Sequence, residues 1–349
     1  MNGPRLYVYG TGDPRLSRLL DSPSFSQLVA RLMKNGVIEP SAAEAALLDD
    51  CLTSELLVRE LSGFVPGPRL VLAPAAIVAP FTGVIAGHLN DYAAVASAAL
   101  PLLRRAFLRT GPAKCFDWAH IQHVVLAGMF LDLAVGSCLW TTGIIHRRYC
   151  DTVLWAIDTA ASRNPFGVQW IGSRTRRCAI AQLWHADVTR PPLRLAESDA
   201  GWLCAAASGN AVAYDPRMLL RLRYLGFVSR SADALRVTVP AFAPADCERL
   251  FPVLIECAMD LVRRVVRPLL ADVDRFQPDG SMAQDSWRHV LIRLLLEAGI
   301  DRVVESGLCD PFPVGVPPVE WGRWSWEESA CGHSLVAGAF EHVRAVATV

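Results

Sequence analysis

The sequence predicts a mainly α-helical protein that also contains small β-hairpins, an α+β fold. Composition is the first observation behind this prediction: hydrophobic residues make up 52% of the 349-residue chain and charged residues 19%, which is typical of a compact, ordered globular protein. Patterning is the second, because apolar residues recur at helical spacing over long segments, whereas strand-like stretches are short. A helix–helix–hairpin module in the second half is expected to be attached to an apolar helical domain.

Three consecutive regions are predicted. Residues 1–190 form a mainly helical domain with an effector or substrate pocket. Residues 191–275 hold the helix–helix–hairpin module and the amphipathic helix that follows it, and residues 276–349 form a helical segment rich in tryptophan and proline. Pro191-Pro192 marks the boundary between the first two regions. A chain of this length can bury a sizeable core in more than one domain.

The N-terminal part begins with a predicted strand at Leu6–Tyr9. Two helices are expected over residues 22–62. The second opens near Ser41, because this hydroxyl can cap the helix while Glu44, three residues later, completes a capping box.

The remainder of the first half is predicted to be apolar and helical over residues 63–150, with one further amphipathic helix over residues 151–162. Strands or a hairpin are expected on either side of the basic turn Ser173–Arg177.

Two apolar segments raise the question of a membrane span. Leu70–Leu103 is interrupted by prolines and polar residues, and Val124–Trp140 is short and carries Asp132 in its middle. Both are therefore predicted to be buried core helices, and no membrane partner is expected.

Helix caps and a hairpin stand out in the stretch Asp199–Pro240. Asp199 opens a first helix, and Asp215-Pro216 supplies an N-cap followed by proline at the first helical position of a second helix. Gly226 fits a left-handed C-cap, and Phe227–Val239 then alternates as two short strands around a polar turn. The predicted order is helix, helix, β-hairpin.

The segment Met218-Leu-Leu-Arg-Leu-Arg-Tyr-Leu-Gly-Phe-Val, followed by Arg230 and by Arg236-Val-Thr-Val, resembles the recognition helix and wing of winged-helix transcription regulators. The resemblance implies that the second helix enters the major groove of double-stranded DNA and that the hairpin contacts the DNA backbone or minor groove. The DNA-facing residues that it implies are Tyr214, Arg217, Arg221, Arg223, Arg230 and Arg236. Met218, Leu222 and Leu225 would face the core.

Local charge agrees with this expectation. Residues 214–240 carry five arginines against Asp215 and Asp233, in a chain whose net charge is zero. Phosphate binding needs such a basic patch. The first helix of a winged-helix module would have to be Ala179–Ala186 or lie elsewhere.

The pattern around Gly226 is not specific to a winged helix, because it occurs three times in the sequence. Apolar residues eight and four positions before a glycine, with another apolar residue after it, also occur before Gly36 and Gly299. All three copies are expected to be helices that end in a glycine cap, so only the hairpin after Gly226 distinguishes that copy.

An amphipathic helix is expected from Pro244 to Arg267, ending at Pro268. Its apolar stripe consists of Leu250, Leu254, Cys257, Leu261 and Val265. Two interpretations are open: the stripe could support a homodimer that binds two half-sites, or it could pack in the protomer's own core.

The favoured function is a cytoplasmic, homodimeric, DNA-binding transcription regulator that responds to a small apolar effector in the first half and needs no cofactor. Cytoplasmic residence follows from ten cysteines without a paired framework and from an N-terminus without signal-peptide features. No enzyme motif such as a P-loop or HExxH occurs.

Two alternatives come from other classes of function. The first is an intracellular enzyme with acid–base or metal chemistry at His120, His123, His88 and Asp132, where the i,i+3 spacing of the first two histidines permits but does not require coordination. The second is an apolar scaffold or interaction protein. Convergence of the histidines would favour the enzyme, and a shared exposed face of arginines would favour DNA binding.

Overall fold

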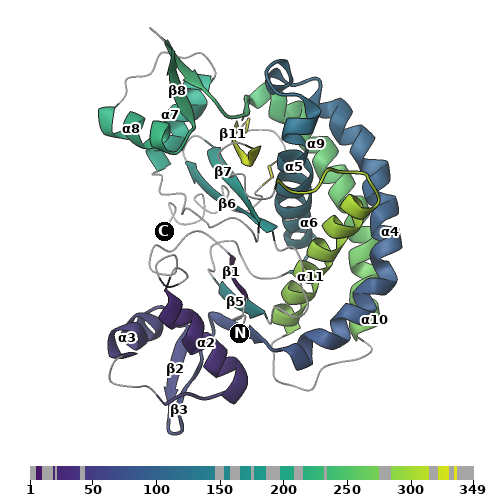
Figure 1. Cartoon of the computed structure of the whole chain (residues 1–349). Coiled ribbons are helices and arrows are strands. Elements are labelled where there is room, and N and C mark those ends of the chain that lie inside the picture. The colour runs from purple at the N-terminus through teal and green to yellow at the C-terminus, as the bar shows by residue number, and fades with distance from the viewer. Residues whose placement is uncertain are drawn as a thin grey trace, which may run out of the picture. The chain divides into compact units, whose positions relative to one another are not determined.

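The computed structural model describes residues 5–9, 19, 22–39, 44–145, 153–157, 166–173, 177–185, 197–207, 215–231, 234–274, 284–313, 321–329 and 334–335. Helices predominate in this part of the chain, and its strands form small sheets (Figure 1). The predicted class, a mainly helical α+β fold, is confirmed.

Two compact units are built from segments that are distant in sequence. Unit 1 contains residues 1–89, 145–163 and 267–298, and unit 2 contains residues 90–144, 164–266 and 299–349. The helices α4 (Ala75–Phe107) and α11 (Gln284–Glu305) contribute residues to both units. The three consecutive regions expected from the sequence do not coincide with these units.

A three-stranded sheet in unit 1 has the order β1–β5–β4. Strand β5 (Val153–Ile157) lies in the centre, antiparallel to β1 (Arg5–Tyr9) and parallel to β4 (Leu70–Ala73). The predicted N-terminal strand is confirmed, but the helix predicted over residues 151–162 is wrong. The short apolar run lies between two partner strands, and such runs do not distinguish a strand from a buried helix by sequence alone.

Helix α2 (Pro23–Asn35) shows why the first helix of unit 1 forms where it does. The Ser22 hydroxyl accepts a hydrogen bond from the Phe25 amide, and Gly36 ends the helix with φ 73°. Phe25, Leu28, Val29 and Leu32 are buried on one face and form part of the core of this unit.

The second helix of this region, α3 (Ala45–Thr53), has its N-cap three residues after the predicted cap, Ser41. Glu44 occupies the N-cap and makes no side-chain capping bond, while Ser41 lies outside the described residues. The antiparallel hairpin of β2 (Leu57–Glu60) and β3 (Gly63–Pro66) then replaces expected helix. Its strands are too short to give a clear alternating pattern.

A four-stranded sheet in unit 2 has the order β10–β11–β7–β6. Strands β6 (Phe166–Ser173) and β7 (Cys178–His185) form the predicted hairpin. Strand β11 (Arg323–Glu327) is antiparallel to β7, and β10 (Ala241–Phe242) is parallel to β11. The sheet therefore unites segments that lie far apart in the sequence.

The most apolar helix of unit 2 consists of α5 (Trp118–His123), the π-helical segment η3 (Val124–Ala134) and α6 (Val135–Thr141). Among the described residues, this stretch alone is long and apolar enough to cross a membrane, and 78% of its most apolar window is buried inside the protein. The Asp132 carboxylate accepts a hydrogen bond of 2.7 Å from the Val168 amide in β6.

The amphipathic helix after the hairpin runs further than predicted. Helix α9 (Pro244–Leu261) continues through the π-helical η5 (Val262–Val266) into α10 (Arg267–Asp274), so the predicted end at Pro268 is wrong. The π-helical turn just before Pro268 alters the backbone hydrogen-bonding register, which lets a proline be accommodated.

The apolar stripe of this helix packs in the core of its own chain. Leu250, Leu254, Cys257, Leu261 and Val265 are all buried. Of the two interpretations open from the sequence, core packing is therefore confirmed, because this stripe has no exposed surface to offer a second copy.

The three glycines of the repeated pattern behave differently. Gly36 and Gly226 have φ values of 73° and 72° and end their helices as predicted. Gly299 lies inside α11, which continues to Glu305, so the cap predicted there is wrong. The reason for glycine at this position is steric, because the Tyr92 ring occupies the space of a side chain.

Candidate nucleic-acid interface

The predicted helix–helix–hairpin order is present in unit 2. Helices α7 (Glu197–Ala207) and α8 (Pro216–Tyr224) precede the antiparallel strands β8 (Val228–Ser231) and β9 (Ala234–Val237). Figure 1 shows α7, α8 and β8 grouped together. We call these four elements the α8 module.

Local sequence determines both ends of α8. The Asp215 carboxylate accepts a 3.0 Å hydrogen bond from the Arg217 amide, and Pro216 occupies the first helical position. At the other end Gly226 adopts positive φ, and the Phe227 amide donates to the Leu222 carbonyl. The capped helix is thereby fixed in length at both ends.

One side of α8 is packed in a hydrophobic cluster. Met218 and Leu222 are buried, and Leu225 is half-buried, as the resemblance implied. The other members of the cluster include Leu203 of α7 and Ile180 of β7. Packing on both neighbours fixes which face of α8 remains outside.

The outer side of α8 carries a basic and partly apolar stripe. Arg217, Leu220, Arg221 and Tyr224 follow helical spacing, and all four are exposed. Leu220 is 64% exposed and Tyr224 is 91% exposed. Arg223 is also exposed. These five residues form what we call the α8 face.

Arg221 has a second role within the module. Its guanidinium donates hydrogen bonds of 2.8 and 3.3 Å to the two oxygens of Asp199, a buried residue of α7. Hydrogen bonding to this carboxylate raises the pKa of Arg221. The ion pair links the two helices, while the arginine side chain remains 43% exposed.

The hairpin places the remaining predicted arginines on neighbouring strands. Arg236 in β9 is exposed and pairs in register with Ser229, whereas Arg230 in β8 pairs with Leu235. Tyr214 lies outside the described residues. The structure thus brings Arg217, Arg221 and Arg223 together on one helix and Arg236 onto the adjoining hairpin.

The helix considered for the start of a winged-helix module is absent at Ala179–Ala186. Residues 178–185 form strand β7, whose residues Cys178–Leu183 are buried, and α7 packs against β6 and β7. A sheet, rather than a further helix from these residues, therefore packs against α7. Because β7 lies between β11 and β6 and is buried on both faces over Cys178–Leu183, its tertiary environment overrode any helical tendency of this apolar run.

The histidines of the enzyme alternative have separate environments. His123 is buried, its Nε2 lies 3.0 Å from the Asp310 carbonyl, and burial lowers its pKa. His120 is exposed and its ring lies 5.6 Å from that of Phe116. The Asp132 carboxylate accepts the hydrogen bond from the Val168 amide of β6.

His88 belongs to unit 1, where its Nε2 lies 3.0 Å from the carboxylate of Asp272. Within the described ranges, no group of three or more histidine, cysteine, aspartate or glutamate side chains is arranged to hold a metal ion. The four residues named for the enzyme alternative are thus engaged in pairwise contacts.

Two buried charged residues of unit 2, one in strand β11 and one directly after it, were not predicted from the sequence. Arg323 in β11 is 4% exposed, and its Nε donates a 2.8 Å hydrogen bond to Gln182 Oε1 of β7. Its guanidinium carbon lies 5.0 Å from the centre of the Phe227 ring. The sequence alone does not reveal that Arg323 is buried, because its strand β11 pairs with β7, which lies more than a hundred residues earlier in the chain.

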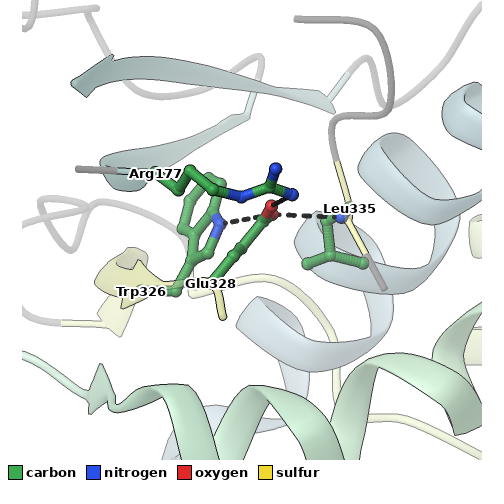
Figure 2. A network of polar contacts seen from close by, with 4 residues as sticks. All are labelled: Arg177, Trp326, Glu328 and Leu335. Atoms are coloured by element: carbon green, nitrogen blue, oxygen red, sulfur yellow. Dashed lines mark hydrogen bonds and ion pairs between the residues drawn. The ribbon is translucent and has the colours of Figure 1, made fainter. Parts of the chain in front are cut away.

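Glu328 is the second of these residues, and its side chain is fully buried. Figure 2 shows its carboxylate between Arg177, the Trp326 indole and Leu335. The indole Nε1 and the Leu335 amide donate to Oε1 at 3.1 and 3.2 Å, and Arg177 lies 3.4 Å from Oε2. Burial raises the pKa of Glu328, and hydrogen bonds from Ser334 and Trp326 oppose this effect.

Known proteins give no guide to the role of these residues. Comparison of the chain with protein-family models, with curated proteins and with solved structures found no match.

Proposed function

We propose that the chain binds double-stranded DNA through the α8 face and the β8–β9 hairpin, and that it acts as a regulator of transcription. The observation that carries the proposal is the two-sided character of α8. Met218 and Leu222 hold its inner side in the core, while its outer side presents exposed arginines, and the hairpin that follows carries the exposed Arg236.

The chemistry of the α8 face suits a DNA major groove. The groove admits one α-helix, and arginines can bind phosphate oxygens or the O6 and N7 atoms of guanine. Leu220 can contact a thymine methyl group, and Tyr224 can donate a hydrogen bond to a phosphate. The hairpin adds Arg236 for the adjoining backbone.

Two copies of the chain are part of the proposal. Helix α8 is short and can read only a few base pairs, and regulators with one short recognition helix generally bind paired half-sites as dimers. The surface that joins the copies would have to differ from the buried stripe of α9.

Fluorescence anisotropy tests the proposal with a labelled mixed-sequence duplex at low and moderate salt. Binding should have a dissociation constant on the order of 10⁻⁶ to 10⁻⁴ M and weaken as salt rises, because bound arginines release counterions from DNA. Absence of binding at low salt would overturn the proposal.

The double variant Arg217→Ala/Arg223→Ala should weaken DNA binding by roughly tenfold or more and reduce the salt slope by about one for each phosphate that is no longer bound. Both side chains are exposed, and neither makes an ion pair among the described residues. The fold should therefore be retained, as circular dichroism can verify.

Arg104→Ala/Arg105→Ala provides the matched control, because it removes the same charge from exposed positions of α4 in the same unit. An equal loss of affinity in both variants would show that only net charge matters and would remove the α8 face from the proposal. Arg221 is left intact in this test, because its replacement would also remove the ion pair to buried Asp199.

A further inference from the structure

Arg221 of the α8 face is held through one edge of its guanidinium. Its Nη2 and Nε atoms donate to the two oxygens of Asp199 at 2.8 and 3.3 Å. A guanidinium has a second edge with a parallel pair of donors, formed by Nη1 and the other hydrogen of Nη2. Among the described residues, Nη1 of Arg221 makes no hydrogen bond. The second edge is therefore left for a ligand.

The two partners of this ion pair differ in exposure. The side chain of Arg221 is 43% exposed, whereas the side chain of Asp199 has no exposed surface. The exposed part of the ion pair thus belongs to the arginine, on the outer stripe of α8. A macromolecule that docks on the α8 face meets the guanidinium and not the carboxylate.

Asp199 lies on a rigid support. It is the third residue of α7, where the helix dipole favours a negative charge. Trp202 and Leu203 of the same helix are buried in the cluster that also contains Met218 and Leu222 of α8. Packing thus fixes the two helices together, and the two hydrogen bonds fix the arginine. An arginine that is held in advance loses less conformational entropy when it binds than one that samples many rotamers.

We propose that Arg221 reads a guanine in the DNA major groove and that Asp199 is its positioning residue. The O6 and N7 atoms of guanine are neighbouring acceptors, which match the two parallel donors of a guanidinium edge. Adenine carries an amino group in place of O6, so it would oppose one of these donors with another donor. The exposed Arg217 and Arg223 are left to bind phosphates, which are contacts without sequence information.

The inference rests on the proposed DNA function and adds the class of sequence that is bound. Selection of bound duplexes from a pool with a randomised central segment tests it with the full chain. The recovered duplexes should share a guanine at a fixed position. Fluorescence anisotropy then compares a recovered duplex with one in which this G·C pair is replaced by A·T, and the wild type should bind the first about tenfold more tightly.

Two variants test the part played by the ion pair. Asp199→Asn removes one of the two acceptors and should bring the ratio of the two affinities close to one. This change makes the chain more positive, so weaker binding of the guanine duplex could not come from lost charge. Arg221→Lys keeps a charge beside Asp199 but lacks the planar fork, and it should also lower the ratio, even if Asp199→Asn fails to fold.

Asp260→Asn is the matched control. It adds the same charge and also removes the partner of an exposed arginine of unit 2, since Asp260 Oδ2 lies 3.4 Å from Arg264 Nη1. This variant should keep the wild-type ratio. If the ion pair only ties α7 to α8, Asp199→Asn would weaken both duplexes alike and keep the ratio, and the inference would be wrong.

Two further outcomes separate this inference from the proposed function. A wild type that binds DNA without preferring guanine would overturn the role of Arg221 and leave the proposed function standing. No binding of any duplex at low salt would overturn both.

Discussion

Replacement of Glu328 by alanine is expected to lower the free energy of unfolding by about 3 kcal/mol, because it leaves buried donors without their acceptor. The Trp326 indole and the Leu335 amide both depend on Oε1, and the side chain of Glu328 is fully buried. Glu328→Gln retains an oxygen for these donors and should cost only about 1 kcal/mol. Urea denaturation of the three proteins measures both differences.

The pH dependence of these variants gives an independent measurement. Since burial raises the pKa of Glu328 above its ordinary value of 4.5, the folded protein holds this proton more tightly than the unfolded chain. The stabilisation associated with this proton is complete below pH 4.5. It is lost as the pH rises through the pKa of the folded state.

The difference in unfolding free energy between the wild type and Glu328→Gln should therefore fall as the pH is raised from about 4.5 towards neutrality. Glutamine does not titrate, so other ionisable groups cancel in this comparison. A difference that stays constant or rises over this range would show that the hydrogen bonds and Arg177, rather than burial, dominate the pKa.

Local signals were sufficient to predict both ends of α8 from the sequence, whereas the predicted start of α7 at Asp199 is wrong, because that helix begins at Glu197. Asp215-Pro216 and Gly226 act through hydrogen bonds and backbone angles within a few residues, and the structure has them as the two ends of α8. The same reasoning predicted α2 and Gly36. Such features depend little on the rest of the chain.

Features that depend on distant partners could not be predicted in the same way. Strand β5 is a strand because β1 and β4 lie on either side of it, and its short apolar sequence is equally compatible with a helix. The bond from Arg323 to Gln182 likewise requires the pairing of β11 with β7. The burial of Arg323 could therefore not be predicted from the sequence, whereas the arginines of the α8 face could be identified there.

Gly299→Ala is expected to lower the free energy of unfolding by about 2–3 kcal/mol, although glycine to alanine normally favours a helix by about 1 kcal/mol. A Cβ atom at this position would overlap three atoms of the Tyr92 ring, which is fully buried. The ring can move only by disturbing its neighbours, because protein interiors are closely packed. Urea denaturation measures the loss.

Gly87→Ala in α4 is the matched control, since a Cβ atom there would have no neighbour within 4 Å, and this variant should be more stable than the wild type by up to about 1 kcal/mol. Gly128→Ala should fall between the two, because its Cβ atom would meet the far edge of the Trp324 ring at 2.7 Å. This order distinguishes steric exclusion from helix propensity. If helix propensity dominated, all three alanine variants would be more stable than the wild type. That result would show that Gly299 is not needed to make room for the Tyr92 ring.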